Sequence, residues 1–136
     1  MNRELAQTVR ERAGERCEYC RIPQSALQFR FQIDHIIAEQ HGGETALGNL
    51  AYACPHCNRH KGPNIAGLDS QSGQLVRLFH PQTDDWIEHF RFVEAVVVGK
   101  TPVGRATVQL LAMNADEPLR FRMTLLQAGV PLVEKT

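Results

Sequence analysis

Residues 33–37 read Ile-Asp-His-Ile-Ile, and the preceding residues 27–33 (LQFRFQI) alternate apolar and polar side chains. This alternation is typical of a half-buried β-strand, which we expect to deliver Asp34 and His35 at its end. Neighbouring residues of a regular strand point to opposite faces. Both side chains can therefore reach one site only if the strand ends, bulges or twists at this pair.

Two CxxC pairs flank this stretch and contain all four cysteines of the chain: Cys17, Cys20, Cys54 and Cys57. In a reducing compartment such pairs favour a metal over disulfides. A spacing of two residues lets both sulfurs of a pair reach one ion, and tetrahedral zinc takes four such ligands. We therefore predict a structural zinc. A thioredoxin-like redox pair is the alternative, which two pairs without a βαβ pattern disfavour.

The distance between the two pairs leaves room for a second function. There are 33 residues between Cys20 and Cys54, against about 15–20 in a simple zinc ribbon. The additional residues are enough for a hairpin and a loop that carry another site.

Composition fits one compact globular domain of 136 residues, with 43% hydrophobic and 22% charged residues. The formal net charge is zero, so overall charge gives no support for nucleic-acid binding, and a local patch and a metal must supply it. No apolar run approaches the ~18–20 residues of a membrane helix. The first residues lack the hydrophobic core of a signal peptide. We expect a cytoplasmic protein without a membrane partner.

Local signals predict most elements of the first half. Residues 3–13 form an amphipathic pattern that Gly14 ends. Residues 42–43 (GG) mark a turn, and a return segment begins at Asn49. Residues 54–61 predict a short helix, with proline in its first turn and glycine after it. Asn58 and a lysine three residues later would share one face of this helix.

The second half predicts strands followed by helices. Residues 75–79 and one or two segments within 87–98 have strand-like composition. Thr101 and the proline after it predict the start of a helix. A second helix would bury a face composed of Leu119, Met123 and Leu126. We divide the chain into residues 1–66 and 67–136, within one compact unit, with residues 69–73 as the boundary loop.

Five motifs in order carry a resemblance to a known family. They are CxYC (17–20), DHI (34–36), GG (42–43), NL (49–50) and CxxCNxxKG (54–62). Together they resemble the HNH nucleases of the ββα-metal (His-Me finger) type. The resemblance implies an α+β fold, in which a ββα-metal core is held by a four-cysteine zinc. Residues 67–136 would be an extension of strands and helices packed on this core.

The resemblance also implies roles for single residues. His35 matches the general base, and Asn49 matches the asparagine that hydrogen-bonds the backbone and orients the base-bearing segment. The third position is Asn58 instead of histidine, so the chain would be an HNN variant. Asp34 and Asn58 would hold one catalytic divalent metal, Mg²⁺ or Mn²⁺, because their oxygens are hard ligands.

The expected function is hydrolysis of phosphodiester bonds by an endonuclease, with DNA as the expected substrate and a homodimer possible. Arg59 and Lys61, at the end of the predicted helix, would contact substrate phosphate. His60 is a competing metal ligand, but it points away from the Asn58 face.

Four further histidines have no predicted part in the chemistry. His41 and His56 are expected to face solvent, and His80 and His89 to be structural.

Two other functions remain open. One is a zinc-stabilised module that binds DNA or protein without catalysis, and the intact set of Asp34, His35 and Asn58 argues against it. The other is a redox or zinc-storage protein, which leaves Asp34 and His35 without a role.

Overall fold

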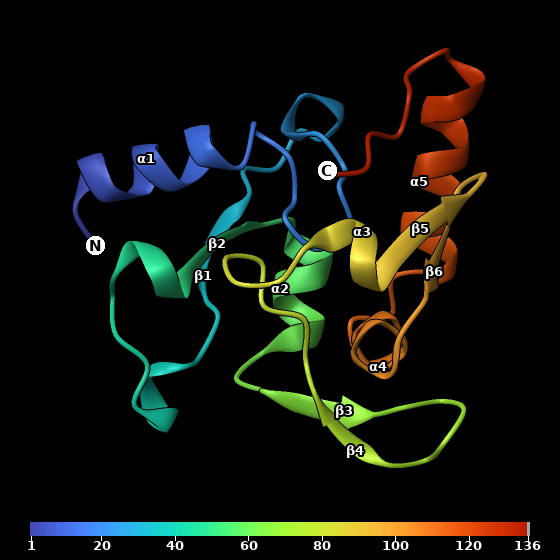
Figure 1. The fold of residues 1–136 in the computed structure, drawn as a ribbon. Coiled ribbons are helices and arrows are strands. Elements are labelled where there is room, and N and C mark those ends of the chain that lie inside the picture. The colour runs from blue at the N-terminus through green and yellow to red at the C-terminus, as the bar shows by residue number, and fades with distance from the viewer. Residues whose placement is uncertain (136) are drawn as a thin grey trace.

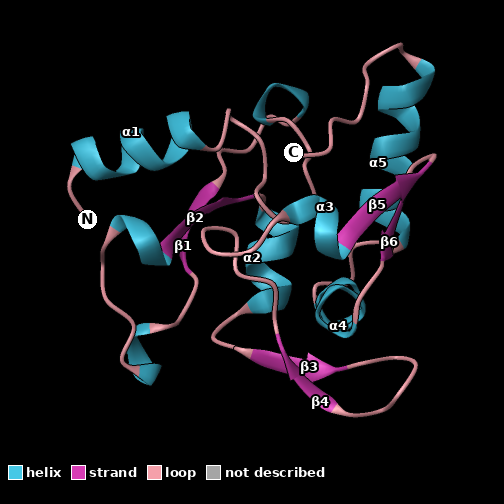
Figure 2. Cartoon of the chain, viewed as in Figure 1, coloured by secondary structure: helices cyan, strands magenta, loops and turns pink. Residues whose placement is uncertain are grey.

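The computed structural model describes residues 1–135, which form small sheets with helices beside and between them, and the β3–β4 hairpin lies at one edge of the molecule (Figure 1). Three single-turn 3₁₀ helices lie at Gln24–Ala26, Glu39–His41 and Leu47–Asn49. The strands pair as three separate antiparallel two-stranded sheets, β1–β2, β3–β4 and β5–β6 (Figure 2). In chain order the other elements are α1 (Arg3–Arg12), β1 (Gln32–His35), β2 (Leu50–Ala53), α2 (Pro55–Lys61), β3 (Ala66–Leu68), β4 (Leu75–Arg77), α3 (Trp86–His89), β5 (Phe90–Val93), β6 (Val96–Gly99), α4 (Pro102–Leu110) and α5 (Asp116–Gln127).

The central unit is β1–β2–α2, the predicted ββα arrangement. β1 and β2 pair in continuous register, with Asp34 opposite Ala51 and His35 opposite Leu50. Every residue of β2 is buried, and α2 follows it directly. The helix begins as predicted, with Pro55 in its first turn and Cys54 as its N-cap.

Helix α1 is fixed to this unit by its last turn. The guanidinium of Arg12 donates hydrogen bonds to Leu47 O (2.8 Å) and Leu50 O (2.6 Å). Val9 is fully buried on the predicted apolar face. Gly14 follows with a φ of +65°, a conformation that glycine adopts without steric cost.

Residues 27–31 do not form the predicted strand. The Gln24 side chain accepts a hydrogen bond from Phe31 N (2.8 Å) and donates one to Phe29 O (2.9 Å), so this backbone pairs with a side chain. β2 ends opposite Gln32, and no partner strand reaches further back. The Phe29 side chain is consequently 74% exposed.

The predicted boundary after residue 66 falls inside β3. Residues 69–73, predicted to be a boundary loop, form the turn of the β3–β4 hairpin. Both oxygens of the buried Asp69 side chain accept hydrogen bonds from Arg105 of α4, at 2.6 and 3.1 Å. The hairpin is thus anchored to the later helices.

The strand predicted at the start of residues 87–98 is wrong, because α3 occupies residues up to His89. The strands predicted in the rest of this segment are confirmed by β5 and β6. Helix α4 lies so close to this region that a Cβ on Gly104 would meet His89 O at 2.1 Å. Thr101 is the N-cap of α4, as predicted, and its Oγ1 accepts a hydrogen bond from Gly104 N.

The buried face of α5 differs from the prediction. Met123 and Leu126 are 45% and 38% exposed, and Leu119 is only partly buried. The residues that α5 buries are Pro118 and Arg122. The apolar periodicity therefore predicted the wrong buried face of α5, because the face that is buried contains Arg122.

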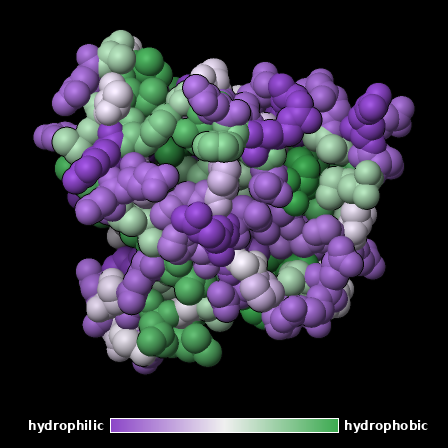
Figure 3. All heavy atoms as spheres, turned by 180° about the vertical axis from the view of Figure 1, so that it is seen from behind, coloured by the Kyte–Doolittle hydropathy of each residue, from purple (hydrophilic) through white to green (hydrophobic). Residues whose placement is uncertain are grey.

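The C-terminal part packs on the first half, as the α+β prediction required. Trp86 Nε1 donates a hydrogen bond to Tyr19 O (2.8 Å), and Gln82 Nε2 donates one to Glu18 Oε2 (2.8 Å). A single cluster of buried side chains joins the two halves, from Val9 to Met113. Seen from behind, most of the surface is hydrophilic and the hydrophobic side chains form separate patches (Figure 3). Within residues 1–135, no helix combines the length and the apolar character needed to cross a bilayer.

Candidate functional site

The four cysteines converge on one point in the core. Their sulfur atoms all lie within 4.8 Å of one another, and all four residues are buried. The sulfurs of Cys20 and Cys54 are 3.7 Å apart. A zinc ion bound at about 2.3 Å by four thiolates requires sulfurs about 3.8 Å apart. The cluster therefore has the dimensions of a tetrahedral metal site.

In each cysteine pair, the backbone amide of the second cysteine donates a hydrogen bond to the sulfur of the first. Cys20 N lies 3.4 Å from Cys17 Sγ, and Cys57 N lies 3.4 Å from Cys54 Sγ. Burial raises the pKa of Cys17, but hydrogen bonds from the other three cysteines outweigh burial and hold that pKa well below its usual value. The pKa values of Cys54 and Cys57 are raised, chiefly by their hydrogen bonds to Cys17, so without a metal the cluster favours one thiolate, on Cys17.

Asp34 is buried beside this cluster, with an exposed fraction of 7%. Its Oδ2 accepts a hydrogen bond from the Tyr19 hydroxyl (2.9 Å) and forms an ion pair with Lys61 Nζ (3.2 Å). Burial raises the pKa of Asp34, and Lys61 and Tyr19 oppose this rise. Oδ1 makes no hydrogen bond to any residue from 1 to 135, so it is the oxygen available to a metal.

Lys61, the last residue of α2, was expected to contact substrate phosphate. It is 1% exposed, and its Nζ also contacts His35 O (3.2 Å) and Gly62 O (3.5 Å). In this structure the amine pairs with Asp34, and a contact with substrate phosphate stays a prediction.

His35 is partly exposed, and its ring is fixed through one nitrogen. Nε2 lies 2.8 Å from Thr45 Oγ1 and 3.4 Å from Glu39 Oε1. A proton on Nε2 satisfies both neighbours and leaves Nδ1 as the basic nitrogen. Nδ1 makes no hydrogen bond within the described part of the chain. Sequence reasoning missed Thr45 and Glu39, although the spacing of four residues between His35 and Glu39 was a usable signal.

Asn49 fixes the loop that follows β1. Its Oδ1 accepts a hydrogen bond from Ile37 N (2.8 Å), and its Nδ2 donates to Ile37 O (2.9 Å) and Glu44 O (2.8 Å). The loop also needs its second glycine, because a Cβ on Gly43 would lie 1.7 Å from Ile37 O. This is the geometry expected of an asparagine that orients the base-bearing segment.

Asp34, His35 and Asn58 line the same open hollow, with a volume of about 360 Å³. β1 ends at His35, which satisfies the expectation that the strand must stop at this pair. No bulge is needed, because the register with β2 is continuous. Two strand residues and one residue of α2 thus share one surface. The rest of the lining is Ile33, Ala38, Glu39, Gln40, Gly62 and Pro63.

The side chains around α2 separate into two groups. Arg59 and His60 are exposed, as expected. His56 was expected to face solvent, but it is partly buried and its Nε2 donates a hydrogen bond to Ala112 O (2.8 Å). The His56 and His60 rings lie 4.2 Å apart, so His60 stacks on His56 and does not line the hollow.

His41 and His89 do not belong to this site. His41 is exposed, as expected. His89 is buried, and its Nδ1 forms a hydrogen bond with Thr101 Oγ1 (2.6 Å), which fits the predicted structural role.

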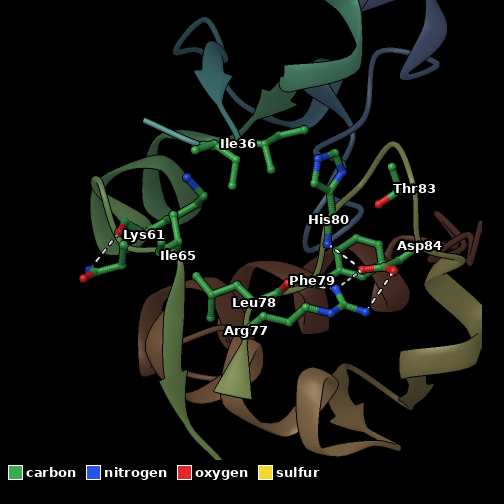
Figure 4. Close-up of a pocket in the computed structure, with 11 residues that line it drawn as sticks. Ile36, Lys61, Ile65, Arg77, Leu78, Phe79, His80, Thr83 and Asp84 are labelled. Carbon is green, nitrogen blue, oxygen red and sulfur yellow. Dashed lines mark hydrogen bonds and ion pairs between the residues drawn. The ribbon is translucent and has the colours of Figure 1, made fainter. Parts of the chain in front are cut away.

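A second pocket of about 360 Å³ lies on the other side of Lys61 (Figure 4). Its polar wall is organised by Asp84, which pairs with Arg77 (2.6 Å) and accepts a hydrogen bond from His80 N (2.8 Å). Burial lowers the pKa of His80. Its apolar wall contains Ile36, Ile65, Leu78 and Phe79. Sequence reasoning gave no signal for this pocket, because its lining residues come from three segments that are far apart in the chain: 36–37, 61–65 and 77–84.

The model of the HNH endonuclease family matches residues 17–64. The matched segment contains the cysteine cluster and all the residues of the open hollow. Comparison with curated proteins and with solved structures gives no significant match. Residues 17–64, with the ββα unit and the cysteine cluster, therefore belong to the HNH endonuclease family.

Proposed function

We propose that this chain is a metal-dependent endonuclease that hydrolyses phosphodiester bonds in DNA. The observation that carries the proposal is the meeting of Asp34, His35 and Asn58 at one open hollow, inside the segment that matches the HNH family. The carboxylate and the amide offer oxygen ligands for a metal ion, and the imidazole can serve as a general base.

Asp34 Oδ1 and the side-chain oxygen of Asn58 are the groups that would hold Mg²⁺ or Mn²⁺. The fit is supported by the lack of a hydrogen-bond partner on Asp34 Oδ1 within residues 1–135 and by its position at the hollow. Both atoms are hard oxygen donors. The bound ion would neutralise charge that develops on the phosphate and on the leaving oxygen.

His35 would act as the general base through Nδ1. A water proton would move to Nδ1 while the water oxygen forms a bond to phosphorus. The bond between phosphorus and the 3′ oxygen breaks, and that oxygen takes a proton from solvent. Glu39 and Thr45 hold the Nε2 side of the ring. The expected products are a 5′-phosphate and a 3′-hydroxyl.

The four cysteines would bind a structural zinc, supported by the sulfur separations. Cys57 is a zinc ligand and Asn58 is its neighbour in α2, so loss of zinc would displace a ligand of the catalytic metal. A reducing cytoplasm would keep these cysteines as thiolates. Metal analysis should give about one zinc per chain.

Residues 1–66 would supply the chemistry, and residues 67–136 would support them within one unit. Arg59 is exposed beside Asn58 on α2 and would contact substrate phosphate. Because the net charge is zero, we expect modest affinity for DNA that decreases as the salt concentration rises.

The test is nicking of supercoiled plasmid by the purified chain with Mg²⁺, Mn²⁺ or no added divalent metal. We expect metal-dependent nicking that His35→Ala abolishes, at unchanged zinc content. His41→Ala is the matched control, because His41 is exposed and does not line the hollow. DNA binding without cleavage by the wild-type chain would instead favour the inactive binding module.

A further inference from the structure

Two buried polar side-chain atoms of the described chain lack a hydrogen-bond partner, and both belong to arginine guanidinium groups. They are Nη1 of Arg21 and Nη1 of Arg122. Arg122 is fully buried and Arg21 is 6% exposed. Unpartnered buried donors are rare in folded proteins, and two on cationic groups need a physical explanation.

The other contacts of these arginines are to neutral groups. Arg122 Nε donates to Ala95 O (2.6 Å), and its Nη2 donates to Met113 O and to Asn114 Oδ1, both at 2.8 Å. Arg21 Nε donates to Val133 O (3.2 Å).

Within residues 1–135, no carboxylate forms an ion pair with either arginine. A buried charge without a counter-charge is strongly unfavourable.

The cysteine cluster is a concentration of negative charge near both arginines, and the buried Glu18 is a further negative group near Arg21. Arg21 follows Cys20 directly in the chain. Helix α5, which carries Arg122, faces the second cysteine pair across a small cavity of about 90 Å³, whose walls include Cys54 and Pro118. Burial lowers the pKa of Arg122, and the thiolates of all four cysteines, Cys20 foremost, raise it.

The charges of the two groups match. Zinc bound by four thiolates carries a net charge of minus two, because four negative sulfurs surround one divalent ion. Two guanidinium groups carry plus two and remain protonated at any physiological pH. We propose that Arg122 and Arg21 are the buried counter-ions of the four-cysteine zinc site.

This inference rests on the zinc assignment in the proposed function and assigns a role to the C-terminal residues. Arg122 lies in α5, and Arg21 is held by Val133 near the C-terminus. The extension thus supplies one counter-ion and positions the other. It would therefore set the affinity of the zinc site while lying outside the matched HNH segment.

The test is the zinc affinity of the full chain, measured by competition with a chromogenic chelator. Arg122→Gln removes the charge, and Arg122→Lys keeps it while losing most of the hydrogen bonds. We expect Arg122→Gln to weaken zinc binding about 10- to 100-fold, the usual effect of removing a partner of metal ligands. Arg122→Lys should stay closer to wild type. Arg120→Gln, an exposed change on the same helix, should have no effect.

Urea unfolding of the same variants separates charge from packing. If Arg122 were only structural, Arg122→Lys and Arg122→Gln would lower zinc affinity equally, and that result would overturn the proposal. Zinc affinity within twofold of wild type in a folded Arg122→Gln chain would also overturn it. Should Arg122→Gln fail to fold, Arg21→Gln and Arg21→Lys give the same comparison. A wild-type chain that contains no zinc would refute the zinc assignment itself, which is a separate result.

Discussion

The buried pair between Lys61 and Asp34 allows a quantitative test of the site. Lys61 Nζ lies 3.2 Å from Asp34 Oδ2, and the two residues are 1% and 7% exposed. Lys61→Met keeps much of the side-chain volume but removes the amine. Asp34 then keeps only the Tyr19 hydroxyl on Oδ2.

The expected loss of unfolding free energy follows from the geometry. Removing one partner of a buried ion pair typically costs about 3–5 kcal/mol, because the other charge is left uncompensated. We expect a value near the lower end, about 3 kcal/mol, since Asp34 retains one hydrogen bond and one oxygen at the hollow. Adding Asp34→Asn should recover at least about 1 kcal/mol, because no buried charge then remains.

The assay is urea unfolding of the wild type, both single variants and the double variant, which gives the coupling energy between the two residues. Arg59→Met is the matched control, because Arg59 is exposed on the same helix. Added Mn²⁺ should stabilise Lys61→Met more than wild type, since the metal would be the only remaining cation partner of Asp34. A loss below about 1 kcal/mol, or additive effects without coupling, would refute this account of the pair.

Three further predictions concern the loop, the metal and pH. Asn49→Ala removes three hydrogen bonds, so it should cost about 2–3 kcal/mol of unfolding free energy and slow cleavage at normal zinc content; an unchanged urea midpoint would contradict this. Asn58→Asp should keep metal-dependent nicking, whereas Asn58→Ala should lose it, and equal activity of the two would exclude Asn58 as a ligand. Urea unfolding without added divalent metal should show opposite pH trends for Asp69 and Asp34. The Arg105 hydrogen bond lowers the pKa of Asp69, so the stability that wild type has over Asp69→Asn should be present above about pH 4 and be lost on acidification. Burial raises the pKa of Asp34, so wild type should gain stability relative to Asp34→Asn as the pH falls through that pKa.

Local chemistry made the central features predictable. The CxxC spacing indicated the sulfur cluster, because two intervening residues are enough to form each knuckle. Proline after Cys54 and glycine after Lys61 bounded helix α2 correctly. Asn49 was identified by its resemblance to the family pattern, and its three hydrogen bonds have the expected geometry.

The features that could not be predicted depend on distant contacts. The strand expected over residues 27–31 is replaced by a segment held by the Gln24 side chain, and periodicity carries no information on that competitor. The pairing of Lys61 with Asp34 was not predicted, because Asp34 lies 27 positions earlier in the chain. The stripe of Leu119, Met123 and Leu126 was assigned to the core, and apolar periodicity gave no signal that Arg122 would be buried instead. In each case the fold brings a polar side chain to a partner that is distant in the chain or outside the repeating pattern, so the sequence pattern alone does not predict the contact.

The central claim is that His35 is the base and that Asp34 and Asn58 hold the metal. Single-turnover DNA cleavage measured against Mn²⁺ concentration tests it most directly. His35→Ala should lower the maximal rate at least about 100-fold without shifting the Mn²⁺ concentration at half-maximal rate, whereas Asn58→Ala should shift that concentration upward. An undiminished rate in His35→Ala would contradict the account.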